Sequence, residues 1–113
     1  MKSKILALSK SEDFKNLLSQ KKISNKYVTI FFGKLANKSK NKLHISFVTK
    51  KKIGNAVKRN KIKRRLKNIV NDATKYINLK FDYSYLVIAK STMLNKEYTI
   101  IKETLFRDLE RIR

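Results

Sequence analysis

The stretch after Gly54 constrains the fold more than any other part of the chain. Apolar side chains recur there at helical spacing, at i, i+4, i+7, i+8, i+11 and i+15, on Ile62, Leu66, Ile69, Val70, Ala73 and Ile77. This period predicts one long helix with an apolar stripe about 100° wide. A stripe of that width has to be covered, so the rest of the chain must supply a second layer of structure.

Three stretches are predicted to be strands of that second layer. They run from Lys26 to Phe32, from Leu43 to about Thr49 and from Lys80 to Ala89, and they are short and rich in β-branched and aromatic residues. Gly33 ends the first strand, and a polar, lysine-rich connection leads to the second. We expect the first two strands to run antiparallel.

Two further helices flank these elements. Ser9 and Glu12 have the spacing of a capping box, so a short helix should begin there and run to about Gln20. Asn95 is expected to cap a C-terminal helix, with Glu97 in its first turn. The apolar stripe of that helix comprises Tyr98, Ile101, Leu105, Leu109 and Ile112. The sequence thus predicts one α+β domain over residues 1–113, a small two-layer sandwich with the order helix, two or three strands, long helix, strand, helix.

The chain carries a large uncompensated positive charge. Lys and Arg number 29 against eight Asp and Glu, which gives a net charge of +21, and residues 50–68 hold ten cations and no acid. A solvated helix face ordinarily mixes charges of both signs, so this stretch is interpreted as a surface that binds a polyanion. Nucleic acid is the first candidate and an anionic membrane surface the second.

The membrane interpretation is the weaker of the two. The chain has no Trp for a membrane interface, and its strands would be unexplained. No run approaches the ~18 apolar residues of a membrane span, and the apolar run near the N-terminus is shorter than the ~7–15 residues of a signal peptide. With no cysteine to indicate an oxidising compartment, we expect a soluble cytoplasmic protein without a membrane partner.

Side chains that could carry catalysis are scarce. His44 is the only histidine and has no partner in the local sequence. Four of the eight acids, namely Glu12, Glu97, Glu103 and Glu110, have capping, dipole or pairing roles on predicted helices, and Asp72 and Asp82 are isolated in sequence. Two glycines cannot form a glycine-rich phosphate loop. We therefore expect neither a catalytic residue nor a metal site in this chain, and we expect a partner to supply any chemistry.

The start of the long helix is expected to bind a phosphate. Gly54 allows a tight turn and Asn55 is a good N-cap, so free N–H groups would lie beside Lys50, Lys51 and Lys52. Arg59 falls in the apolar sector of the helix, one turn before the stripe begins. We expect its side chain to project past the edge of the core toward a phosphate.

Residues 51–64 resemble a family signature. The run Lys51-Lys52-Ile53-Gly54-Asn55-Ala56-Val57-Lys58-Arg59-Asn60-Lys61-Ile62-Lys63-Arg64 is similar to the pattern K-K-x-G-x-A-V-x-R-N-R-x-K-R of the bacterial ribonuclease P protein subunit. The segments SKSEDF, FDYSYLVIAK and TLFRDLERI are similar to a helix, a strand and the last helix of that family. The resemblance therefore covers nearly the whole chain.

The resemblance implies a fold and a role. The fold is of the ribosomal-protein type, with a left-handed strand–helix–strand crossover. The protein would bind a large catalytic RNA and the single-stranded 5′ leader of precursor tRNA, and would act as an endoribonuclease only within the holoenzyme, with catalysis in the RNA. Any Mg²⁺ would be held mainly by that RNA, and no protein partner is implied. A ribosomal or architectural RNA-binding protein without a processing role is the alternative.

The resemblance also implies two sets of binding residues. The catalytic RNA would meet Lys51, Lys52, Asn55, Arg59, Asn60, Lys61, Lys63, Arg64 and Lys67, whereas a cleft for the leader would contain Phe14, Leu18 and Ile30. Lys61 and Lys67 stand where the family commonly has Arg, so charge is kept but the bidentate fork is lost. Leu18 and Ile30 stand where relatives often carry a ring, and for Phe14 a core role is equally open. Stacking of a base on a ring is worth ~1–3 kcal/mol, which apolar contact replaces only in part.

Overall fold

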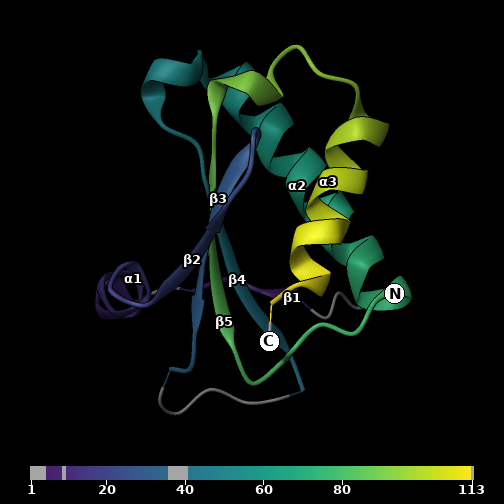
Figure 1. The fold of residues 1–113 in the computed structure, drawn as a ribbon. Coiled ribbons are helices and arrows are strands. Elements are labelled where there is room, and N and C mark those ends of the chain that lie inside the picture. The colour runs from purple at the N-terminus through teal and green to yellow at the C-terminus, as the bar shows by residue number, and fades with distance from the viewer. Residues whose placement is uncertain (1–4, 9, 36–40, 113) are drawn as a thin grey trace.

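The computed structural model describes residues 5–8, 10–35 and 41–112. In these ranges one five-stranded sheet is combined with three α-helices and two short 3₁₀ helices (Figure 1). The elements in chain order are β1 (Ile5–Leu6), α1 (Ser11–Leu18), β2 (Lys21–Ser24), β3 (Val28–Gly33), β4 (Leu43–Val48), η1 (Lys51–Ile53), α2 (Ala56–Tyr76), β5 (Ser84–Ala89), η2 (Ser91–Met93) and α3 (Tyr98–Glu110). The α+β class is confirmed.

The sheet has the strand order β1-β4-β5-β3-β2. The predicted opposite directions of β3 and β4 are confirmed, because β5 is antiparallel to β3 and parallel to β4. The two strands are not hydrogen-bonded to each other, since β5 lies between them. Together β4, α2 and β5 make a strand–helix–strand unit with parallel strands. The left-handed sense of that crossover stays a prediction.

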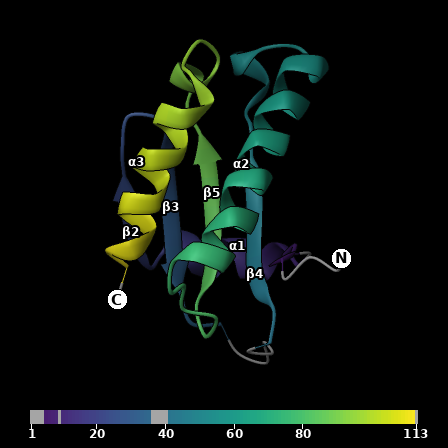
Figure 2. The same ribbon diagram turned by 90° about the vertical axis from the view of Figure 1, so that its right-hand side faces the viewer.

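The helices lie on opposite sides of the sheet. Figure 1 shows α1 on one face and both α2 and α3 on the other, and α2 and α3 run side by side in Figure 2. The main core fills the space between the sheet and these two helices, and its fully buried members include Ile30, Leu43, Ile45, Leu66, Ile69, Tyr85, Ile101 and Leu105. A smaller cluster around Leu17 and Leu86 lies on the α1 face. The molecule thus has the two predicted layers and a short third one formed by α1.

The long helix is confirmed together with its cap. Ile62, Leu66, Ile69, Val70 and Ala73 are all buried on α2. The side chain of Asn55 accepts a hydrogen bond from the backbone N–H of Lys58 at 3.0 Å, as an N-cap residue should. The helix ends at Tyr76, so Ile77, the last residue of the predicted stripe, is its C-cap residue.

The other helix boundaries differ from the sequence prediction. The N-cap residue of α1 is Lys10, which makes no side-chain capping bond; Ser9, the predicted cap, lies outside the described residues, and α1 ends two residues before Gln20. Asn95 does not cap α3. It lies in the turn between η2 and α3, and the N-cap residue of α3 is Glu97. These helices are held by apolar packing rather than by side-chain caps.

The last strand begins later than predicted. Residues 81–83 form a turn and a bend, and β5 starts at Ser84. The hydroxyl of Tyr85 donates a hydrogen bond to the carbonyl of Lys80 at 2.8 Å, which closes this turn against the strand. Within the described residues, no helix has both the length and the apolar composition of a membrane span.

Candidate RNA interface

The predicted RNA-binding residues lie at one end of the molecule, on η1, on the loop after it and on α2. Arg59 is half-buried, and the other eight are exposed: Lys51, Lys52, Asn55, Asn60, Lys61, Lys63, Arg64 and Lys67. Among the described residues none of their charged groups belongs to an ion pair, since the pairs found join Lys34 to Asp82, Lys102 to Asp72 and Arg111 to Asp108. The surface is therefore cationic and uncompensated within the described residues.

The first turn of α2 retains free hydrogen-bond donors. The side-chain Oδ1 of Asn55 accepts a hydrogen bond from the backbone N–H of Lys58, and its backbone carbonyl accepts one from the N–H of Arg59, at 3.0 Å each. The N–H groups of Ala56 and Val57 have no partner among the described residues. Two free N–H groups at a helix start beside unpaired lysines favour binding of an anion.

Gly54 contributes to this turn differently from the prediction. Its φ of 164° is extended backbone, which any residue can adopt, so no tight turn requires a glycine here. What glycine provides is space, because an added Cβ would lie 2.9 Å from Cδ and 3.2 Å from Cβ of Lys58. The stem of Lys58 therefore lies directly across Gly54.

Arg59 and Thr49 carry the two buried side-chain polar atoms that lack a hydrogen-bond partner among the described residues, namely Nε and Oγ1. Thr49 directly follows β4, and Arg59 lies in the first turns of α2. Both atoms belong to the end of the molecule where the cationic surface begins. An unpaired buried donor or acceptor costs about 1–3 kcal/mol, so this end of the fold holds unmet hydrogen-bonding capacity.

The cations of α2 occupy two flanks of the helix. Arg59, Lys63 and Lys67 recur every four residues on one flank. Lys61 lies elsewhere, because two residues at about 100° each place it about 160° around the axis from Arg59. It lines a hollow on the flank toward η2. The nine predicted residues therefore do not share a single face.

The predicted leader cleft is only partly supported by the positions of its residues. Phe14 is half-buried on α1, and Leu18 is 50% exposed at the end of that helix. Ile30 is 0% exposed and belongs to the core under α2 and α3, on the opposite face of the sheet. The prediction that Ile30 contacts a leader is therefore wrong.

Phe31 occupies the place that was predicted for Ile30. Successive side chains of a strand point to opposite faces, and Phe31 packs with Phe14 in the smaller cluster on the α1 face, where it is half-buried. The ammonium of Lys22 lies 5.9 Å from the centre of its ring. The sequence prediction missed this residue because Tyr27 to Phe32 is nearly all apolar and hides the period of two.

A hollow connects the α1 face to the cationic end. One side of the hollow is formed by Thr29 and Ile88, which are paired across β3 and β5. Its wall also includes Lys50, Lys52 and Lys90. The ammonium of Lys90 is fixed by hydrogen bonds to the hydroxyl of Ser24 and the carbonyl of Asn25 at 2.8 and 2.6 Å. A strand of RNA on the α1 face could thus continue toward η1 beside positive charge.

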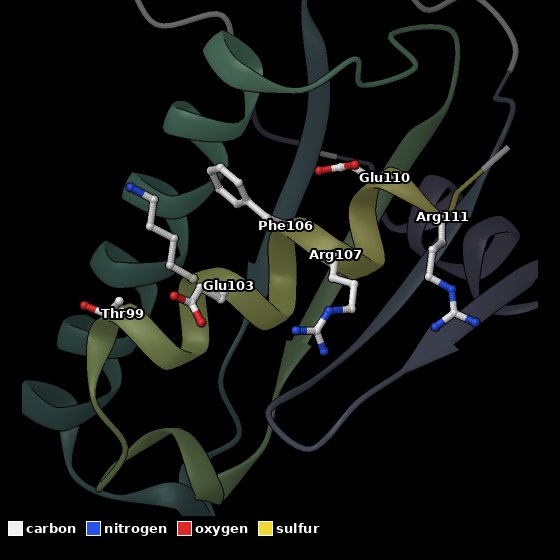
Figure 3. A pocket seen from close by; sticks show the side chains of 7 residues that line it. Thr99, Glu103, Phe106, Arg107, Glu110 and Arg111 are labelled. Atoms are coloured by element: carbon white, nitrogen blue, oxygen red, sulfur yellow. The ribbon is translucent and has the colours of Figure 1, made fainter.

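The outer face of α3 has a different character. Figure 3 shows a hollow there, lined by Thr99, Lys102, Glu103, Phe106, Arg107, Glu110 and Arg111. Lys102 binds Asp72 at 2.9 Å, and the hydrogen bond to this carboxylate raises the pKa of the lysine. Because acids and bases alternate on this face, it is a poor surface for RNA.

The described residues offer little catalytic chemistry. They contain no group of three or more His, Cys, Asp and Glu side chains that could hold a metal ion. His44 is buried in β4, 6% exposed. Its exposed cations suit the interface to binding a polyanion.

The chain is similar to proteins of one family. A family model described as Ribonuclease P matches residues 3–113. The ribonuclease P protein component of Carboxydothermus hydrogenoformans is 33% identical over 102 residues, which cover 87% of this chain and 83% of that protein. The solved structure of the RNase P protein from Thermotoga maritima has a TM-score of 0.80 at 25% identity and covers 96% of this chain and 98% of its own. The Staphylococcus aureus RNase P protein, at 21% identity, has the same fold with a TM-score of 0.76 over 93% of this chain and 92% of that one.

Proposed function

The chain belongs to the ribonuclease P protein family, and on that premise we propose that α2 and η1 bind the RNA subunit while the α1 face binds the leader of precursor tRNA. As a ribonuclease P protein subunit, it takes part in tRNA processing and associates with the RNA of that enzyme. The proposal assigns each of the two RNAs to a surface of this chain. We also infer that the protein works in the cytoplasm, in keeping with its lack of cysteine.

The unpaired cations of α2 carry the first part of the proposal. Their opposite stripe, including Leu66 and Ile69, is fully buried against the sheet, which holds the helix and leaves its charged side toward solvent. Since Arg64 and Lys63 find no carboxylate within the described residues, a bound phosphate backbone is the natural counter-charge. The free N–H groups of Ala56 and Val57 add a second kind of phosphate ligand.

The apolar patch on the α1 face supports the second part. Phe14 and Phe31 are half-buried rings in one cluster, and Leu18 is exposed beside them. Rings of this kind accept stacked bases without regard to sequence, which suits a leader that differs between tRNAs. The hollow with Lys50, Lys52 and Lys90 would then receive the leader's phosphates.

We propose that the RNA subunit performs the hydrolysis. The described residues contain no group of three or more His, Cys, Asp and Glu side chains that could hold a catalytic metal ion, which supports this division. Mg²⁺ ions would be held mainly by RNA phosphates, since hard cations of this kind prefer oxygen ligands that carry charge. The protein's share is to bind both RNAs and to screen their mutual repulsion.

Cleavage of precursor tRNA by the transcribed RNA subunit tests the proposal. At low Mg²⁺, addition of this protein should raise the rate of leader removal, because its cations replace part of the ionic screening. A leaderless tRNA should gain less in affinity than the precursor. Cleavage that is the same with and without the protein would contradict the proposal, and co-sedimentation with ribosomes in moderate salt would favour the ribosomal alternative.

A further inference from the structure

The flank of α2 that faces η2 forms a hollow of its own. Its wall contains Lys58, Lys61 and Arg65 from α2, and Met93, Leu94 and Asn95 close it on the other side. The three cations follow one another at intervals of three and four residues, so they line one side of the helix. This side is separate from the flank that carries Arg59, Lys63 and Lys67.

No acid compensates the cations of this hollow within the described residues. None of Lys58, Lys61 and Arg65 belongs to an ion pair there. The next acid along the same flank is Asp72, and its carboxylate is already bound by Lys102 at 2.9 Å. Three like charges in one concave site repel each other, and an anion in the hollow would relieve that repulsion.

The hollow is rigid where it meets the core. Met93 is 0% and Ile62 2% exposed, so both are anchored in the main core. Lys58 is held by its stem against Gly54 and by its backbone hydrogen bond to Asn55. The cationic groups are thus presented by fixed backbone, which reduces the entropy lost on binding.

Asn95 adds polar groups to the same hollow. Its side chain does not cap α3, and its amide has no hydrogen-bond partner among the described residues. An amide N–H beside Lys and Arg is a common ligand of phosphate oxygens. The residue that sequence patterning assigned to a helix cap is therefore available to an anion.

We propose that this hollow is a second phosphate site for RNA, so that α2 is held by RNA backbone on both flanks. The proposal rests on the proposed function, because it requires that α2 binds RNA. The ligand is a phosphodiester, which can belong to the RNA subunit or to precursor tRNA. Lys61 belongs to this second site rather than to the flank of Arg59.

A charge-matched pair of double variants tests the site. Lys58→Gln with Arg65→Gln should weaken binding of the RNA that occupies the hollow, either the RNA subunit or precursor tRNA, roughly tenfold. For that RNA it should also lower the slope of log K against log salt by about two. Lys75→Gln with Arg107→Gln removes the same charge from exposed positions outside the hollow. That control should change the affinity little, and both variants should keep the wild-type melting temperature.

Directed cleavage identifies which RNA lies in the hollow. The chain has no cysteine, so Asn95→Cys and Asn60→Cys each provide one attachment point for an iron chelate that generates hydroxyl radicals. Position 95 should cut RNA at nucleotides different from those cut from position 60. The RNA that is cut from position 95, either the RNA subunit or precursor tRNA, is the one whose phosphate lies in the hollow. Cleavage from position 95 at background level only would contradict the proposed site.

Failure of this site can be told apart from failure of the proposed function. If wild-type protein binds the RNA subunit, and the two double variants bind both the RNA subunit and precursor tRNA equally well, the second site is excluded and the proposed function stands. If wild-type protein does not bind the RNA subunit at all, both are excluded together.

Discussion

Ile30 and Phe31 are neighbours in β3 whose side chains lie on opposite faces of the sheet, one in the main core and the other in the cluster against α1. Each face has its own role. The face of Ile30 holds α2 in place, and the face of Phe31 is proposed to bind the leader. Two adjacent substitutions should therefore have unrelated effects.

Replacing Phe31 by Leu should weaken binding of precursor tRNA while leaving the fold intact. Leucine keeps apolar packing against the cluster of Leu8, Leu17 and Leu86 but removes the ring, so a stacked base would lose about 1–3 kcal/mol. The holoenzyme's affinity for precursor tRNA, measured beside its affinity for leaderless tRNA, checks this. Equal losses for both RNAs would show that Phe31 does not touch the leader.

Replacing Ile30 by Ala should destabilise the domain instead. Ile30 is fully buried, and the cavity left by the larger side chain costs about 2–5 kcal/mol. Urea unfolding followed by circular dichroism measures this change. A variant as stable as wild type, with reduced leader binding, would instead place Ile30 in the leader cleft.

Arg64 and Leu66 should separate binding from stability on α2 itself. Arg64 is exposed and Leu66 is 0% exposed, so Arg64→Ala should weaken RNA binding without a change in unfolding free energy. Leu66→Ala should lower that free energy by about 2–5 kcal/mol. Thermal melting and filter binding on both variants check the pair, and melting of the Arg64 variant at lower temperature would assign Arg64 to the fold.

Asp108 should stabilise the fold through Asn25. The amide of Asn25 donates a hydrogen bond to Oδ2 of Asp108 at 2.7 Å, and its Oδ1 accepts from the N–H groups of Tyr27 and Val28 at 2.7 and 2.9 Å. Asp108→Ala leaves this turn without its anchor on α3 and should cost about 1–3 kcal/mol. Asp108→Asn keeps an acceptor and should cost less; equal unfolding midpoints for all three proteins would contradict the role.

Alkaline pH should destabilise the domain through Tyr85. Burial raises the pKa of this phenol above its ordinary value. The unfolded chain ionises from about pH 10, while the folded chain keeps the proton, so stability is full below pH 10 and falls as pH rises above it. The difference in unfolding free energy between wild type and Tyr85→Phe, followed from pH 8 to 11, isolates this group; a constant difference would contradict the prediction.

Much of the fold could be predicted because its largest element has a continuous period. Six apolar positions from Ile62 to Ile77 define α2 from its second turn to its C-cap residue. Its start is marked by Asn55, whose capping role depends on local chemistry alone. The strand β2 shows the opposite case. Lys21 to Ser24 is mostly polar and exposed, and it becomes a strand only because β3 offers it an edge to pair with, which no local pattern reveals.

The site could be predicted as a list of residues but not as a geometry. The family resemblance places Ile30 in the leader cleft, but a shift of one residue in a strand moves a side chain to the other face, and Phe31 is the residue on the α1 face. On α2 the signature runs continuously through Arg59, Asn60 and Lys61, yet the helix places its first and third residues on different flanks. The hollow beside Lys61 depends on η2, which lies some thirty residues further along the chain.

The salt dependence of binding to the RNA subunit tests the central claim most directly, namely that the cationic sides of α2 hold an RNA backbone while the apolar stripe is packed on the sheet. We predict that log K falls linearly with log salt, with a slope that corresponds to about 5–8 neutralised phosphates. An affinity that is insensitive to salt between low and moderate concentrations would contradict the account.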